Sequence, residues 1–117
     1  MKILVIDDNN SLTHSIERIL SGAGHVVVVA DDGEQGLSMF QADCPDLVIC
    51  DLVMPKEGGH FVIAEIRREA PATKIIAISG SVAVEGLAGA LESGADEIIA
   101  KPFDAATLLD KIKTVCR

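Results

Sequence analysis

The sequence contains no tryptophan and no tyrosine, and aromatic residues make up only 3% of its 117 positions. No apolar stretch comes near the roughly 20 residues that a membrane-spanning helix needs. The first residues, Met1-Lys2 followed by a strand-like run, lack the apolar segment and cleavage site of a signal peptide. Together these absences predict a cytoplasmic protein with no membrane association.

Basic residues are few and scattered. Ten Lys and Arg stand against 18 Asp and Glu, which gives a formal net charge of −8. No cluster of Lys or Arg interrupts this acidic balance. Direct binding to nucleic acid or to an anionic membrane is therefore disfavoured, and a protein partner is expected instead.

Cysteine and histidine spacings typical of a zinc site are also missing. The three cysteines, an odd number without close pairs, fit reduced thiols in the cytosol. Cys50 is expected to pack in the core as a small apolar residue. The cysteines are Cys44, Cys50 and Cys116, and the histidines are His14, His25 and His60.

What the chain does contain is a regular alternation of short apolar runs and helical stretches, with no repeat or linker-like segment. Strands are predicted near 2–6, 25–29, 46–50, 74–78 and 97–100, and helices near 10–21, 33–42, 58–69, 84–93 and 104–115. This alternation predicts one α/β domain over 1–117, a doubly wound, five-stranded parallel sheet with helices on both faces.

Polar residues follow four of the apolar runs: Asp7-Asp8, Asp51, Ser79 and Lys101. Because parallel strands all point the same way, residues at their carboxyl ends gather at one edge of the sheet. With the strand order 2-1-3-4-5, the first and third strands are neighbours, and the three acids meet where ligands bind such sheets. Three close carboxylates repel one another unless a cation joins them, so a divalent metal is predicted.

Each of these residues also has a purely local interpretation. Asp7 with Asn9 or Asn10 could cap the first helix, Asp51 could be a turn residue, and Lys101 could be ordinary surface. Each local interpretation is credible alone, but all of them holding together would be a coincidence. The metal-site hypothesis is therefore preferred.

Two further features have no catalytic interpretation at this stage. The second acidic pair, Asp31-Asp32, lies before Gly33 and is predicted to cap a helix. Gly86 and Gly89 weaken the helix over 84–93, each by about 0.5–1 kcal/mol relative to alanine. They indicate either close packing against a neighbour or a helix able to shift, and the sequence favours neither.

Taken together, the strand-end motifs resemble those of the receiver domain of bacterial response regulators, the CheY-like fold of two-component signalling. The resemblance covers essentially the whole chain, and four motifs in order, each at a strand end, make it specific. The motifs are Val5-Ile6-Asp7-Asp8, Asp51-Leu52-Val53-Met54-Pro55 with Gly59, Ser79-Gly80, and Lys101-Pro102-Phe103.

The resemblance implies a role for each acid. Asp51 would accept a phosphoryl group from a phosphohistidine of a sensor histidine kinase or a histidine phosphotransfer protein. Asp8, Asp51 and the backbone carbonyl of Val53 would bind Mg²⁺, with Mn²⁺ as an alternative, and Asp7 would act through a metal-bound water. Lys101 would pair with the carboxylate before transfer and with a phosphoryl oxygen afterwards.

Around the phosphoryl group, the resemblance assigns contacts to Ser79, Gly80 and Lys101, and a cis peptide bond to Lys101–Pro102. Two positions depart from the family pattern. Ile98 stands where the last strand usually carries Tyr or Phe, so the usual coupling between hydroxyl and aromatic ring is in doubt. The loop at 56–59 lacks the common apolar residue and acidic cap, so the third helix is expected to start less firmly.

These features predict a phosphorylation-driven switch rather than a metabolic enzyme. The domain would catalyse its own Mg²⁺-dependent phosphorylation and then the hydrolysis of the acyl phosphate. It would signal as a monomer through its fourth helix, fifth strand and fifth helix, either to a protein partner or to an effector domain absent from this chain.

Three rival classes of protein fit the sequence less well. A flavodoxin-like electron carrier needs a hydroxyl- and glycine-rich phosphate loop and aromatic walls, which this chain lacks. A phosphatase of the haloacid-dehalogenase type needs its second Asp two residues after the first, but here Asp7 and Asp8 are adjacent. A degenerate receiver that is never phosphorylated is disfavoured by the intact set Asp7, Asp8, Asp51, Ser79 and Lys101.

Overall fold

Five strands alternate with five helices in the computed structural model, which describes residues 1–54, 58–80 and 84–116, with the backbone alone at 84–88. The elements are β1 (Lys2–Ile6), α1 (Asn10–Gly22), β2 (Val26–Ala30), α2 (Gly33–Asp43), β3 (Leu47–Asp51), α3 (Gly59–Glu69), β4 (Lys74–Ser79), α4 (Val84–Ser93), β5 (Glu97–Ala100) and α5 (Ala105–Val115). In this part of the chain no helix is both long enough and apolar enough to cross a membrane.

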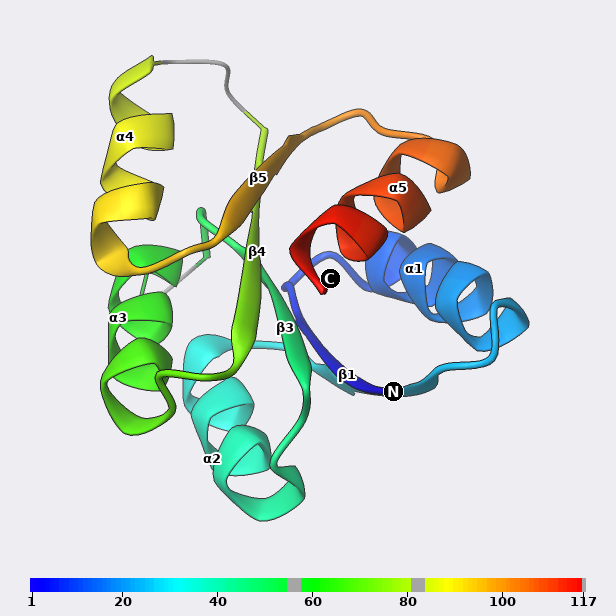
Figure 1. The fold of residues 1–117 in the computed structure, drawn as a ribbon, viewed down its shortest axis with the longest axis horizontal. Helices are drawn as coiled ribbons and strands as arrows, with labels where there is room; N and C mark the ends of the chain where they lie inside the picture. Colours follow the sequence, from blue (N-terminus) through cyan, green and yellow to red (C-terminus); the bar gives the residue numbers. More distant parts are fainter. Residues whose placement is uncertain (55–57, 81–83, 117) are drawn as a thin grey trace.

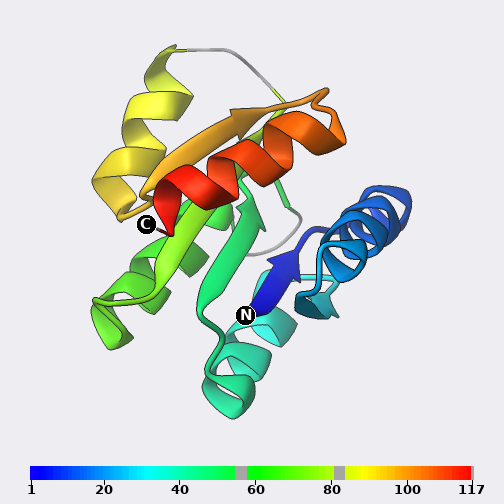
Figure 2. The ribbon, with the colours of Figure 1, turned by 45° about the vertical axis from the view of Figure 1, so that its right-hand side comes forward.

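All the strands are parallel and form one sheet in the order β2-β1-β3-β4-β5, which confirms the predicted topology. Helices α1 and α5 cover one face, and α2, α3 and α4 cover the other (Figures 1 and 2). The central strand β3 is buried along its whole length. Burial from both faces explains why it is a continuous apolar run rather than an alternating one.

Two cores flank the sheet. On the α1 and α5 face, Ile16 and Leu20 pack with Leu108 and Ile112 against the inner strands. On the opposite face, residues from α2, α3 and α4 pack on the other side of the same strands; they include Phe40, Val62, Ile63, Ile66 and Ala90. The sheet is thereby packed between two apolar layers.

Side-chain caps set the start of three helices. Asn9 accepts a hydrogen bond from the Leu12 amide, Asp32 from the Gln35 amide, and Asp104 from the Thr107 amide. The predicted capping by Asp32 is confirmed. Helix α3 differs, because its N-cap residue is Gly58, which offers no side-chain hydrogen bond. This agrees with the predicted weaker start of that helix, while the preceding residues 55–57 lie outside the described part of the chain.

The structure favours close packing as the reason for one of the two glycines in α4. A Cβ atom added at Gly89 would lie 3.2 Å from Cε1 of His60, which is tighter than an ordinary van der Waals contact. Gly89 therefore lets α4 approach α3 closely. Gly86 lies outside the residues whose surroundings the structure describes, so its role stays a prediction.

Candidate metal and phosphoryl-acceptor site

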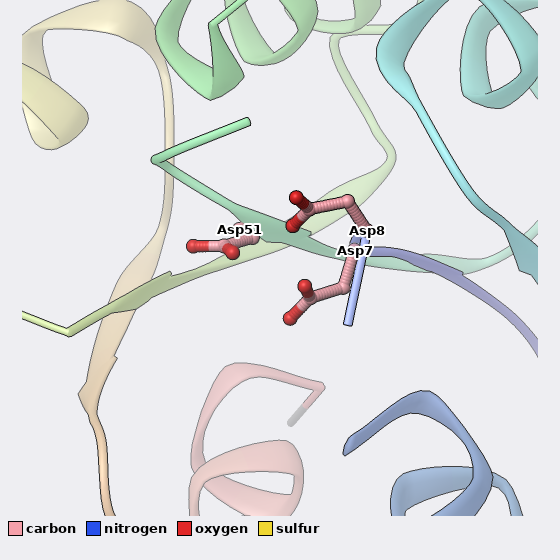
Figure 3. A group of neighbouring side chains, drawn as sticks. All are labelled: Asp7, Asp8 and Asp51. Carbon is pink, nitrogen blue, oxygen red and sulfur yellow. The ribbon is translucent and has the colours of Figure 1, made fainter. Parts of the chain in front are cut away.

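Three carboxylates converge at the carboxyl edge of the sheet (Figure 3). Asp7 and Asp8 follow β1, Asp51 ends β3, and the two strands are hydrogen-bonded neighbours. One carboxylate oxygen from each acid lies within 4.8 Å of those of the other two. Asp7 and Asp51 are buried, whereas Asp8 is exposed. The strand order alone thus brings together acids that are more than 40 positions apart in the sequence.

Lys101 completes the cluster from the end of β5, which lies two strands away from β3 in the sheet. Its Nζ atom lies 3.3 Å from Oδ2 of Asp51 and 3.5 Å from Oδ2 of Asp7. The lysine follows β5, and its backbone amide donates to the Ser79 carbonyl at 2.7 Å. The Lys101–Pro102 peptide bond is cis, the isomer that the resemblance implies.

Burial disfavours the charged form of Asp7. It raises the pKa of Asp7 to about 6, and the charge of Asp51 adds to the rise, whereas the Asn9 amide and Lys101 act in the opposite direction. One oxygen of Asp7 accepts a hydrogen bond from Asn9, but the buried Oδ2 has no hydrogen-bond partner among the described residues. Three carboxylates against one ammonium leave a formal excess of two negative charges.

This donor set fits Mg²⁺. The ion takes hard oxygen ligands, tolerates only one or two carboxylates directly and keeps several waters. A dication also matches the excess charge, and a water bound to it would give Oδ2 of Asp7, which has only the ion pair with Lys101, a hydrogen-bond partner.

The backbone after β3 contacts the Asp51 carboxylate. The Val53 amide donates to Oδ1 of Asp51 at 3.2 Å, so one carboxylate oxygen is held there while Lys101 approaches the other. The side chain of Val53 is 75% exposed, which places it at the solvent side of the site. The role of its carbonyl as a metal ligand stays a prediction.

Ser79 and Gly80 lie at the same edge, at the end of β4. Ser79 is buried and pairs in the sheet with Ala100. A Cβ atom added at Gly80 would lie 3.9 Å from Cδ of Lys101, an ordinary contact distance. The lack of a side chain at this position therefore leaves room beside the lysine stem.

Neighbouring residues fit their predicted places. Cys50 is fully buried, and burial together with the charges of Asp51 and Asp7 raises the pKa of its thiol. This supports its interpretation as a core residue. Ile98 is partly buried and packs against the core on the α3 and α4 face.

The local interpretations are partly right. Asn9 does cap α1, and Asp7 does bind the Asn9 amide. Capping accounts for only one oxygen of Asp7, however, and for neither the convergence with Asp51 nor the approach of Lys101. A helix cap and a candidate metal site therefore coexist in the same turn.

The sequence analysis missed the contact that Gly59 makes. A Cβ atom added there would lie 2.0 Å from the backbone oxygen of Asp51 and 2.6 Å from Cα of Leu52. The Gly59 amide also donates to the Leu52 carbonyl at 3.1 Å. Gly59 was part of the motif, but its spacing from Asp51 did not show that α3 begins directly against that residue.

With this geometry in place, comparison with known proteins gives a consistent result. The family model described as response regulator receiver domain matches residues 3–113. The chain belongs to this family, whose members act in two-component signalling. Neither the electron-carrier nor the dehalogenase-type interpretation is supported.

Relatives and solved structures agree. The chain is 42% identical over 116 residues to the probable transcriptional regulator ycf27 of Porphyridium aerugineum, covering 99% of this chain and 48% of that protein. It is 34% identical to the transcriptional regulatory protein DltR of Streptococcus agalactiae, covering 97% of this chain and 50% of the relative. The chain thus spans about half the length of the curated relatives it matches.

Among solved structures, the chemotaxis protein CheY4 of Vibrio cholerae superimposes with a TM-score of 0.93 at 28% identity, over 97% of each chain. A response regulator receiver domain from Clostridium thermocellum gives a TM-score of 0.91 at 33% identity, over 97% of this chain and 92% of that one. These similarities confirm the fold class.

Proposed function

We propose that this domain is a phosphorylation-driven switch in which Asp51 accepts a phosphoryl group from a phosphohistidine. The observation that carries the proposal is the place of the Asp51 carboxylate, buried between two other acids and the ammonium group of Lys101. The donor would be a sensor histidine kinase or a histidine phosphotransfer protein, and the transfer would take place in the cytoplasm, where this domain is expected.

In the proposed reaction, a carboxylate oxygen of Asp51 attacks phosphorus, the phosphorus–nitrogen bond breaks, and its electron pair returns to the imidazole of the donor. Asp8, Asp51 and the Val53 carbonyl would hold Mg²⁺, with Asp7 bonded through a water; when bound, the ion neutralises charge on the phosphoryl oxygens. Asp51 is positioned by the Val53 amide, which fixes one of its oxygens.

Lys101 and Ser79 would stabilise the product. Lys101 lies at ion-pair distance from Asp51 and is positioned to move to a phosphoryl oxygen. The hydroxyl of Ser79 and the amide of Gly80 would donate to the other oxygens. Water attack on the acyl phosphate would then reset the switch and release inorganic phosphate. The output would pass from a monomer to a protein partner, or to an effector domain outside this chain, without direct nucleic-acid binding by this domain.

Incubation with acetyl phosphate and Mg²⁺ tests the proposal. Intact-protein mass spectrometry should show the gain of one phosphoryl group, and fragmentation should place it on Asp51. Asp51→Asn should abolish the gain, because an amide is too weak a nucleophile. The matched control Asp31→Asn changes an exposed acid that follows β2 and should leave the gain unchanged. A wild-type protein that stays unmodified, or a gain that survives in Asp51→Asn, would contradict the proposal and favour a degenerate receiver.

A second prediction concerns the metal. Asp8→Ala should weaken Mg²⁺ binding by at least roughly 10- to 100-fold, the loss typical even of residues that only support a metal ligand. Titration of amide resonances with Mg²⁺ measures this affinity directly, with Asp31→Ala as the control of equal charge change. Unchanged affinity in Asp8→Ala would rule out the ligand role of this acid.

A further inference from the structure

The start of α3 lies directly against the acceptor residue. Gly59, the first residue of this helix, approaches the Asp51 carbonyl so closely that no side chain fits between them. Its amide is hydrogen-bonded to Leu52. Because packed interiors have low compressibility, a displacement of the backbone at Asp51 must also displace the first turn of α3.

The next residue, His60, contacts α4. Its Cε1 atom lies so close to Gly89 that a Cβ atom added there would be only 3.2 Å away, and its Nδ1 atom lies 3.4 Å from Oγ of Ser93. The same hydroxyl donates to the Gly89 carbonyl at 2.9 Å, which fixes its direction. His60 is thus in contact with two positions of α4 that are one turn apart. Helices α3 and α4 themselves are neighbours in the fold (Figure 1).

Helix α4 is suited to respond to this contact. Its interior glycines lower its intrinsic helical stability, so its position depends on the packing it receives. Among the described residues, the element it contacts most is α3 rather than either neighbouring strand. A shift of His60 would therefore change the environment of α4 more directly than a shift of β5 would.

We propose that His60 couples the acceptor site to α4: a change at Asp51 moves Gly59, and His60 transmits the movement to Gly89 and Ser93. The inference rests on the phosphorylation of Asp51 proposed above. It names the residues through which the structural effect of phosphorylation would reach α4. His60 is a positioning residue here, since it does not touch the reacting atoms.

The first test measures hydrogen exchange of the α4 amides before and after treatment with acetyl phosphate and Mg²⁺. In the wild type, phosphorylation should change the exchange rates of peptide 84–93 by about fivefold or more, the lower end of typical allosteric coupling. His60→Ala and Ser93→Ala should gain the phosphoryl group normally but lose most of this change. Leu91→Ala, at an exposed position of the same helix, should respond as the wild type does.

A second measurement does not depend on phosphorylation. In the untreated protein, Ser93→Ala should shift the amide resonances of Gly59 and Asp51, and His60→Ala should remove this sensitivity to Ser93→Ala. Leu91→Ala should leave both resonances in place. A merely structural role for His60 would lower stability without producing this pattern.

The outcomes separate the two proposals. Normal phosphorylation with an undiminished α4 response in His60→Ala overturns the coupling and leaves the function intact. If the wild type is never phosphorylated, the proposed function is wrong. The amide resonances of the untreated protein then test the coupling alone, and unshifted Gly59 and Asp51 signals in Ser93→Ala would overturn it as well.

Discussion

Gly59→Ala is expected to lower the free energy of unfolding on the order of 3 kcal/mol, at the severe end of the range for overpacked sites. The added methyl carbon would lie 2.0 Å from the backbone oxygen of Asp51 and 2.6 Å from the Cα atom of Leu52. Both neighbours are backbone atoms, which cannot rotate away as a flexible side chain could. Relief of the overlap requires α3 or the end of β3 to shift. Urea denaturation of the two proteins measures the difference.

The neighbouring glycine provides the control. Gly58 precedes the helix with an extended backbone (φ −69°, ψ 157°) that alanine adopts freely, and no atom of the described residues lies within 4 Å of its Cβ position. Gly58→Ala should therefore change the free energy of unfolding by no more than about 0.5 kcal/mol. Equal losses in the two variants would mean that the loop before α3 tolerates no side chain at all, and the specific contact with Asp51 would be wrong.

Most of the fold could be predicted because local signals agree with the global arrangement. The interiors of β1, β3 and β4 are apolar runs with polar residues only at the strand ends, since these strands are buried by helices on both faces. The start of β2 was placed one residue too early, because the valine run gives no boundary of its own. In the structure, His25 still belongs to the preceding turn, where its amide bonds the Leu20 carbonyl.

The site could be predicted in part. Asp7, Asp8 and Asp51 were expected to meet once the strand order was assumed, because the acids stand at strand ends and parallel strands share an edge. The distance that Lys101 spans to reach both Asp51 and Asp7 depends on side-chain packing, which no sequence pattern contains. The contacts of Gly59 and His60 depend on how α3 and α4 lie against the sheet, a long-range property without a local signal.

Asp7→Asn should stabilise the metal-free protein above pH 6, by on the order of 2 kcal/mol. The folded state raises the pKa of Asp7 from 3.8 to about 6, chiefly through burial, so the native protein holds this proton more tightly than the unfolded chain does. The stabilising contribution of the protonated carboxyl is complete below pH 3.8 and is lost as the pH rises through 6. Above that range the wild type carries a buried charge beside Asp51, and asparagine does not.

Urea denaturation between pH 4 and pH 8 in EDTA measures this difference, and the advantage of Asp7→Asn should shrink steadily as the pH falls below 6. Asp31→Asn, at an exposed position, should stay within about 0.5 kcal/mol of the wild type. An Asp7→Asn variant with no advantage at pH 8 would mean that Lys101 alone compensates the buried charge.

Saturating Mg²⁺ should reduce or reverse the stability advantage of Asp7→Asn over the wild type. A ligand that binds only the folded state stabilises it according to its affinity. The wild type offers a dication one more negative charge than Asp7→Asn does, so it should gain more from the metal. Asp7 therefore lowers the stability of the metal-free fold while strengthening the site for a cation, in agreement with its buried Oδ2, which has an ion pair with Lys101 but no hydrogen bond among the described residues. Equal gains from Mg²⁺ in both proteins would show that Asp7 plays no part in holding the ion.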